Sequence, residues 1–255
     1  MTTMIQSEDP TLHVGLIEAT VWADAVEDIT DGIFPRDDED KLAFWEAAGI
    51  IADDQIDELW GRAISVAQKA TRASELLSRK DDVVFSATVL VDGGWVVTCT
   101  SRATVANVNG TDSLDKIHPM LEVAIAPAER IWQVIRRVLP PEEALRREPR
   151  ATNVDEAKQI SVDLSAIPET MRATPETFAA HIHEMPNLPP QIVDISDPRA
   201  TVFTYTLVAD DAGVHTSNKT WVLGKALYLI DADTASMWEV PEGDLGHTLV
   251  ASLTQ

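Results

Sequence analysis

Apolar side chains recur at helical spacing in several stretches of the chain. The clearest stripe runs from Ile56 to Ala67, is expected to pack on a sheet, and is predicted to start at a cap formed by Asp53 or Asp54. Residues 127–139 are predicted to form another helix that ends before two consecutive prolines. Further helices are predicted at 18–29, 42–49, 113–125, 174–185 and 244–253.

Other stretches are rich in β-branched residues and alternate with a period of two. They predict strands at 11–17, 83–91, 95–101, 104–108, 201–209, 215–222 and 226–230. Asp92-Gly93-Gly94 is typical of a tight hairpin turn, and Asn109-Gly110 is a second turn signal. Residues 72–79 fit a helix and a strand equally well. Hairpins dominate and long βαβ alternation is missing, so we expect an α+β fold with a twisted, largely antiparallel sheet flanked by helices.

One strand–turn–strand pattern occurs twice. Six residues of the first copy match six of the second at one fixed offset: Val84, Phe85, Thr88, Asp92, Val96 and Thr98 match Val202, Phe203, Thr206, Asp210, Val214 and Thr216. Each copy follows an acid-capped helix and closes on a short amphipathic helix. We therefore expect a single two-lobed domain over 1–255, with quasi-symmetric halves at about 1–140 and 150–255. The charged, proline-marked residues 142–153 are expected to connect them.

The repeated strands are expected to have two different faces, one buried in the core and one that is a candidate for binding a partner. Because strand side chains alternate, one face is expected to bury against helices: Phe85, Ala87, Val89 and Val91, with Phe203, Tyr205, Leu207 and Ala209. The opposite face carries mainly Ser, Thr and Val. It is either an ordinary, partly covered face or a platform for an apolar helix tip or strand of a partner.

Partner contacts are expected on this second face and at two tryptophans near strand or turn edges. The candidates are Ser86, Thr88, Trp95, Thr204, Thr206 and Trp238. Charge substitutions at Thr88 and Thr206 are expected to weaken partner capture and leave the fold intact.

The chain is strongly acidic. Its 42 Asp and Glu residues against 20 Lys and Arg give a formal net charge of −22. This charge repels phosphate backbones and anionic membranes, so a nucleic-acid partner is not expected, and it helps to keep the protein dissolved. Six arginines nevertheless gather in one region: Arg130, Arg136, Arg137, Arg146, Arg147 and Arg150. They either solvate helix ends, or dock an acidic partner or the acidic surface of this protein itself.

Length and cysteine usage also narrow the class of protein. A hydrophobic content of 45% over 255 residues allows a substantial core without metal or disulfide support. No run of 18 apolar residues occurs, so membrane insertion is not expected, and residues 1–10 lack the pattern of a secretory signal. Cys99 is the only cysteine, which precludes an intramolecular disulfide. These features predict a cytoplasmic protein.

Sequence patterns for catalysis are missing. The chain has no glycine-rich phosphate-binding pattern, no nucleophile elbow and no zinc-protease helix. His181 and His183 are two positions apart on a predicted helix and would converge poorly on a metal. The acidic runs at 37–40 and at Asp231 and Asp233 lack the glycine of a calcium loop. We therefore predict no catalytic residue, no metal and no cofactor, with a hydrolase using a carboxylate or histidine site between the lobes as the alternative.

The order of these elements resembles the EspG-type chaperones of actinobacterial type VII (ESX) secretion systems. The likeness is carried by five segments: LHVGLIEATVWADAVEDI, FWEAAGIIADDQIDELWGRAISVAQ, RASELLSRKDDVVFSATVLVDGGWVV, FTYTLVADDAGVHTSNKTWVLGKALYLID and EGDLGHTLVASL. It covers most of the chain but is poor from 142 to 188. The resemblance implies a two-lobed α+β fold, with 72–79 as a strand.

The same resemblance implies a function. EspG-type chaperones are cytosolic and non-catalytic, and they bind the aggregation-prone helical tip of a secreted heterodimer. We therefore expect a secretion chaperone or adaptor whose partner is a PE/PPE-like or related ESX substrate. A homodimer is a further assembly left open by the sequence, and a purely structural oligomer is the third alternative.

Overall fold

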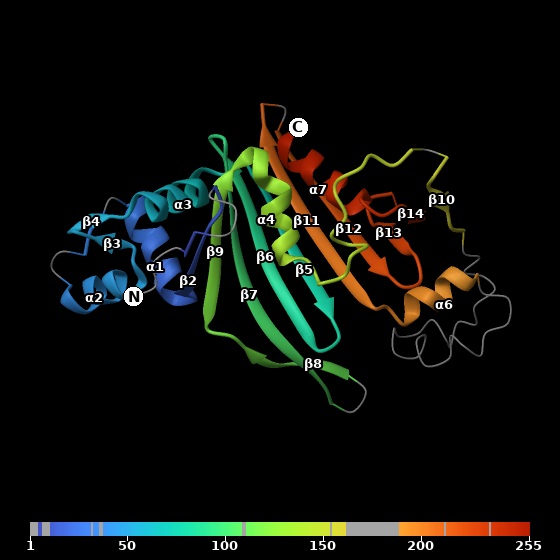
Figure 1. Ribbon diagram of the computed structural model, residues 1–255, viewed down its shortest axis with the longest axis horizontal. Coiled ribbons are helices and arrows are strands. Elements are labelled where there is room, and N and C mark those ends of the chain that lie inside the picture. Colours follow the sequence, from blue (N-terminus) through green and yellow to red (C-terminus); the bar gives the residue numbers. More distant parts are fainter. Residues whose placement is uncertain are drawn as a thin grey trace.

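A single large antiparallel sheet dominates the fold (Figure 1). The computed structural model describes residues 5–6, 11–31, 33–35, 38–108, 111–153, 155–161, 189–211, 213–234 and 236–255. Within them, the sheet has twelve strands: eleven follow the order β1-β2-β9-β7-β6-β5-β11-β12-β13-β14-β10, and the twelfth, β8, pairs with the outer part of β7. The predicted fold class, α+β with a largely antiparallel sheet flanked by helices, is confirmed.

The strands are β1 (Ile5–Gln6), β2 (His13–Glu18), β5 (Arg72–Lys80), β6 (Val83–Asp92), β7 (Trp95–Val108), β8 (Thr111–Ile117), β9 (Met120–Pro127), β10 (Lys158–Gln159), β11 (Ala200–Asp210), β12 (Gly213–Leu223), β13 (Leu227–Asp231) and β14 (Ser236–Val240). A separate ladder joins β3 (Ile51–Ala52) to β4 (Gln55–Ile56). Residues 72–79 lie in strand β5, as the family resemblance implied.

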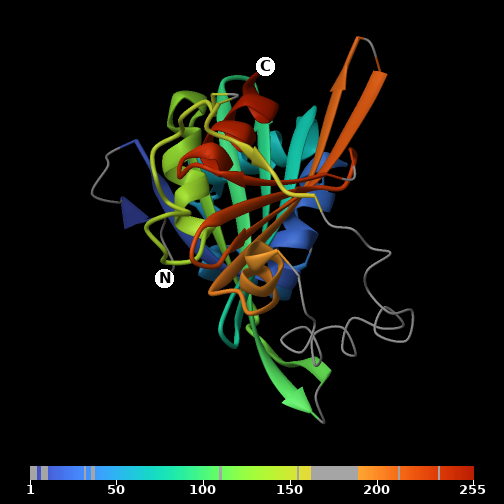
Figure 2. The same ribbon diagram turned by 90° about the vertical axis from the view of Figure 1, so that its right-hand side faces the viewer.

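Helices cover both faces of the sheet (Figures 1 and 2). They are α1 (Ala19–Thr30), α2 (Glu39–Ala48), α3 (Glu58–Lys69), the 3-10 turn η1 (Ala128–Arg130), α4 (Ile131–Val138), α6 (Pro190–Ser196) and α7 (Asp244–Thr254). Helices α4 and α7 lie on one face, and α1, α2 and α3 lie on the other, over the β2–β9–β7 end. Helix α6 sits beside the β12–β13 turn, where Asp194 accepts hydrogen bonds from the Lys225 backbone N–H and the Tyr228 hydroxyl, both at 2.8 Å.

Two hydrophobic cores result, one on each face. Successive residues of a strand point to opposite faces, so neighbours in β7 enter different cores: Val96 packs with α4 and α7, and Val97 packs with α1 to α3. Both side chains are fully buried. The sheet is therefore the middle layer between two helical layers.

Capping residues set the helix starts. Asp38 caps α2 through the Lys41 backbone N–H at 3.0 Å. Asp57 caps α3, its Oδ1 accepting from the backbone N–H groups of Leu59 at 3.0 Å and Trp60 at 3.1 Å. The predicted cap at Asp53 or Asp54 is wrong. Both have positive φ, 52° and 59°, and form the tight turn between β3 and β4, which delays the helix.

The hairpin turn at Gly93 and Gly94 is confirmed. Both glycines have positive φ, 55° and 79°, which L-residues with a side chain rarely adopt, and Asp92 pairs directly with Trp95. This turn fixes the β6–β7 register. The other turn signal, Asn109-Gly110, and the helix predicted at 174–185 lie outside the described residues.

The helix predicted at 113–125 is wrong. This stretch forms β8 and the first part of β9, separated by His118 and Pro119. Residues Val123 to Ala126 are all fully buried because helices cover β9 on both faces. A strand covered on both faces loses its alternating pattern, so its apolar run could not be told from a helix.

The two copies of the repeated sequence form β6–β7 and β11–β12. The two copies do not pair directly with each other in the sheet: β6 and β7 lie on one side of β5, and β12 lies on the far side of β11. Strands β5 and β11 pair directly and join the two copies at the centre of the sheet.

Burial in the second copy is opposite to the prediction. In β6, Ala87 and Val89 face α4 and α7, as expected. In β11, the residues on that side are Val202, Thr204 and Thr206, all nearly inaccessible to solvent. Phe203, expected in the core, is 40% exposed instead. A shift of one position exchanges the two faces of a strand, and the packing of α7 decides which face is buried.

Candidate partner-binding surface

Part of the sheet has an apolar face that no described helix covers. Leu76 and Ser78 of β5 are buried toward α4 and α7, so Leu77 between them points to the other side, where it is 48% exposed. Phe203 of β11 lies directly opposite Leu77 in the register, and Ser86 of β6 lies opposite Leu77 on its other flank. We call this region the open sheet face. Its members are Leu77, Val84, Ser86, Thr88, Phe203 and Tyr205.

The apolar surface continues onto the arm formed by β7 and β8, which projects from the body in Figure 1. Val84 pairs with Ala103, and Ala103 pairs with Ile117. Ile117 is 65% exposed and Leu114, opposite Val105, is 63% exposed. A register shift between Thr104 and Val105 keeps both large side chains on the side of Val84. Exposed apolar side chains thus extend from the centre of the sheet to its projecting arm.

Two predicted contacts, Ser86 and Thr88, lie on the open sheet face. Thr204 and Thr206 do not. They point to the opposite side and are only 2% and 4% exposed. The Thr206 hydroxyl is 3.0 Å from that of Ser74, itself completely buried. The expectation that these four residues share one accessible face is therefore wrong.

The two predicted tryptophans lie on different sides of the sheet. Trp95 packs against the α1–α3 core, and the Arg62 guanidinium lies 4.4 Å from its ring centroid. Trp238 packs against the other core, and its Nε1 donates to the Ser236 hydroxyl at 2.9 Å. Neither is next to Ser86 in the register.

Sequence reasoning missed Leu77 and Phe203, the largest exposed side chains of the open sheet face. Leu77 lies in the segment whose periodicity fitted a helix and a strand equally well. Phe203 was assigned to the core by analogy with Phe85. Once β5 is a strand, the alternation Glu75, Leu77, Arg79 against Ser74, Leu76, Ser78 is the signal that could have identified its accessible side.

The arginine cluster binds acidic groups and carbonyls of this protein. Arg136 pairs with Glu148 at 3.6 Å, Arg137 with Glu122 at 3.0 Å, Arg147 with Glu143 at 3.0 Å and Glu242 at 2.6 Å, and Arg150 with Glu156 at 2.9 Å. Arg146 donates to the Leu139 carbonyl. Of the two docking hypotheses, these contacts favour the protein's own acidic surface.

The buried carboxylates are similarly occupied. Glu142 is 7% exposed and binds Lys80 with one oxygen and Arg199 with the other. Asp244 is 6% exposed and accepts from the Thr152 hydroxyl at 2.6 Å and from Trp221 Nε1 at 3.0 Å. Both carboxylates therefore serve to hold segments of the chain together.

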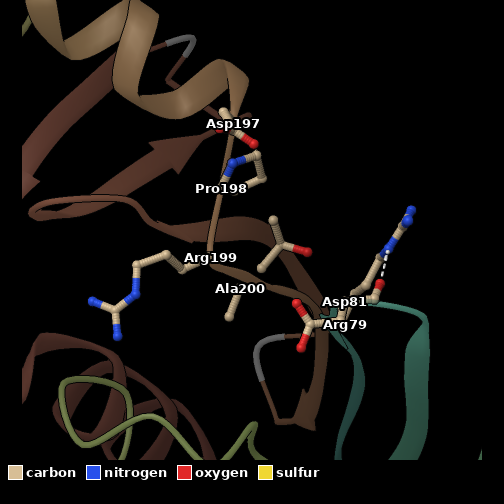
Figure 3. A pocket seen from close by; sticks show the side chains of 7 residues that line it. Arg79, Asp81, Asp197, Pro198, Arg199 and Ala200 are labelled. Atoms are coloured by element: carbon tan, nitrogen blue, oxygen red, sulfur yellow. Dashed lines mark hydrogen bonds between the residues drawn. The ribbon is translucent and has the colours of Figure 1, made fainter.

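A cavity of about 380 Å³ lies at the ends of β5 and β11. Figure 3 shows the side chains that line it. Arg79 and Arg199 both line it, but Arg199 points away from Arg79 and Asp81. Arg79 Nε donates to the Asp81 backbone carbonyl at 3.1 Å. The polar groups of this cavity do not converge on one point, as a hydrolase site would require.

The lone cysteine and possible metal ligands were the other candidates for chemistry. Burial raises the pKa of the Cys99 thiol to about 12, so the thiol is neutral at physiological pH. His181 and His183 lie outside the described residues. Across the part of the chain that the structure describes, no group of three or more His, Cys, Asp and Glu side chains could hold a metal ion. In the same part, every helix is too short or too polar to cross a bilayer.

Comparison with known proteins found a solved structure with a similar architecture. No family model matches the sequence, and no curated protein matches it either. A solved structure does match: the Mycobacterium tuberculosis type VII secretion system chaperone EspG5, in complex with a PE25–PPE41 dimer, with a TM-score of 0.55 and 13% sequence identity. The superposition covers 94% of this chain and 95% of EspG5. The chain has the EspG fold.

The resemblance drawn from the sequence is confirmed at the level of this fold. Coverage is nearly complete in both directions, so the likeness extends over nearly the whole length of both chains. At this identity the likeness establishes the architecture alone. The open sheet face is a feature of this chain's own residues within that EspG fold.

Proposed function

We propose that this protein is a cytosolic, non-catalytic chaperone that binds a helical substrate of a type VII secretion system, such as a PE/PPE-like heterodimer. The EspG fold supports this class of protein, because the matching EspG5 structure contains a PE25–PPE41 dimer. The accessible apolar side chains of the open sheet face support the location that we propose for the substrate. The observation that carries the proposal is the pairing of Leu77 with Phe203, two half-exposed apolar side chains at the centre of the sheet.

An exposed apolar surface of this kind is suited to binding an apolar surface of a partner. Contiguous exposed apolar patches on soluble proteins mark interaction sites, because their burial removes hydrocarbon from water. Small hydroxyls at Ser86 and Thr88 flank Leu77 and leave room for a protruding helix tip. The surrounding acidic surface, from a net charge of −22, would keep the complex dissolved.

The test is a capture experiment with two matched leucines. Leu77 on the open face and Leu16 on the α4 side of β2 are both 48% exposed, and both lie in strands. We expect the tagged wild-type chain and the Leu16→Asp variant to recover the same small secreted helical pair from the host. The Leu77→Asp and Phe203→Asp variants should remain folded by circular dichroism but lose that pair.

Two results would overturn the proposal. One is recovery of the pair by Leu77→Asp and Phe203→Asp at the wild-type level. The other is failure of the wild-type chain to recover any secreted helical pair when the secretion genes are expressed.

A further inference from the structure

An unpaired carboxylate lies at one end of the apolar centre of the open sheet face. Glu75 precedes Leu77 by two positions in β5, so both side chains point to the same side of the sheet. In the register it lies between Tyr205 of β11 and Thr88 of β6. Glu75 is exposed, and the structure gives it no hydrogen bond or ion pair with any other residue that it describes.

The other end of the apolar centre, two positions beyond Leu77 along β5, carries a cation. Arg79 follows Leu77 by two positions and also faces the open side. Its Nε is already bound to the Asp81 carbonyl, as the dashed line in Figure 3 marks. The open sheet face therefore carries an apolar centre, a bound cation at one end and a free anion at the other.

Covering the open sheet face would remove water from Glu75. A carboxylate that loses its hydration without gaining a partner is strongly destabilising, whereas a charge-assisted hydrogen bond compensates for that loss. A partner that seats on Leu77 and Phe203 therefore needs a cation close to Glu75. A purely apolar or acidic tip would leave this carboxylate unpaired.

Spacing fixes where that cation lies in the partner. Two residues of a strand span about 6.6 Å, and a helix rises about 1.5 Å per residue, so the separation corresponds to about four helical residues. We infer that the bound helix carries a lysine or arginine about one turn from its apolar anchor, and that Glu75 selects it. This inference rests on the proposed chaperone function and adds to it the charge pattern of the substrate.

The experiment first identifies the partner at this site. A photo-reactive benzoylphenylalanine in place of Leu77 should cross-link the bound helix in the host, and the cross-linked peptide identifies it. The purified partner is then titrated against the wild-type chain, Glu75→Gln and the control Glu129→Gln, an exposed glutamate in η1. At low salt we expect Glu75→Gln to weaken binding about tenfold or more, with a shallower salt dependence, and Glu129→Gln to bind like the wild type.

Charge exchange completes the test. Glu75→Lys should bind poorly, and replacing the partner's lysine or arginine by glutamate should restore its affinity. If the photo-reactive chain cross-links no secreted helix, the proposed function fails and this inference fails with it. If cross-linking succeeds but Glu75→Gln binds as tightly as the wild type, the inference alone is overturned.

Discussion

Asp244 Oδ2 accepts a hydrogen bond from Trp221 Nε1 at 3.0 Å, inside the core between α7 and β12. Its other oxygen accepts from the Thr152 hydroxyl at 2.6 Å. This single carboxylate joins the start of the last helix to the sheet and to the segment that follows α4. We expect Asp244→Ala to lower the free energy of unfolding by about 2–3 kcal/mol, because a buried indole N–H loses its acceptor. Urea denaturation measures this change.

A double-mutant cycle provides the control. Trp221→Phe removes the donor, so Asp244→Ala should cost less free energy of unfolding in that background than in the wild type, by about 1 kcal/mol. Equal costs in the two backgrounds would mean that this hydrogen bond contributes nothing to stability.

Glu142 links the two central strands, β5 and β11, through two ion pairs. It binds Lys80 at the end of β5 and Arg199 just before β11. We expect Glu142→Gln to lower the free energy of unfolding by about 1–2 kcal/mol, less than for a fully buried pair, because both cations remain partly exposed to water. Chemical denaturation compares it with Glu143→Gln, whose side chain is 80% exposed and which should change stability by less than about 0.5 kcal/mol. A similar loss in both variants would contradict this role.

The two equivalent threonines of the repeated sequence should respond oppositely to charge. Thr206→Asp places a carboxylate in the core beside Ser74, and we expect it to lower the free energy of unfolding by about 3 kcal/mol or more. Thr88→Asp adds its charge on the open sheet face and should cost less than about 1 kcal/mol. Thermal unfolding of both variants checks the difference. Similar melting temperatures would refute the assignment of opposite faces.

Stability should depend on the Cys99 thiol at alkaline pH. Burial raises its pKa from 9.0 to about 12, so the folded chain holds this proton over a range where the unfolded chain releases it. The resulting stabilisation is complete below pH 9 and declines as the pH rises toward 12. When the pH rises from 8 to 10.5, the free energy of unfolding of Cys99→Ala should therefore fall by about 1–2 kcal/mol less than that of the wild type. Urea denaturation at the two pH values measures this difference. Parallel pH dependences in the two proteins would contradict the raised pKa.

Local signals were sufficient for much of the fold. The Gly93-Gly94 turn requires positive φ, and the stripe of α3 is apolar on one side only, so both could be predicted from the sequence. Strand β9 could not, because helices on both faces make its apolar residues contiguous. The short β14 carried no pattern distinct enough to be recognised.

The open sheet face was harder to predict than the fold. Ser86 and Thr88 could be placed together on one face of β6 because this strand follows a simple alternation. The choice between Phe203 and Thr204 as the accessible residue depends on the position of α7, which starts some forty residues later in the chain. A tertiary contact of this kind leaves no trace in the alternation of β11 itself, where both sides carry residues that suit a sheet.

The pairing of β5 with β11 has a consequence for biosynthesis. These neighbours are more than a hundred positions apart in the chain, so the ribosome releases β5 long before its partner strand exists. Until then one long edge of the nascent sheet is unpaired, and α7, one of the two helices toward which Leu76 is buried, does not yet exist. The chain therefore passes through a stage in which part of its own apolar surface is unshielded.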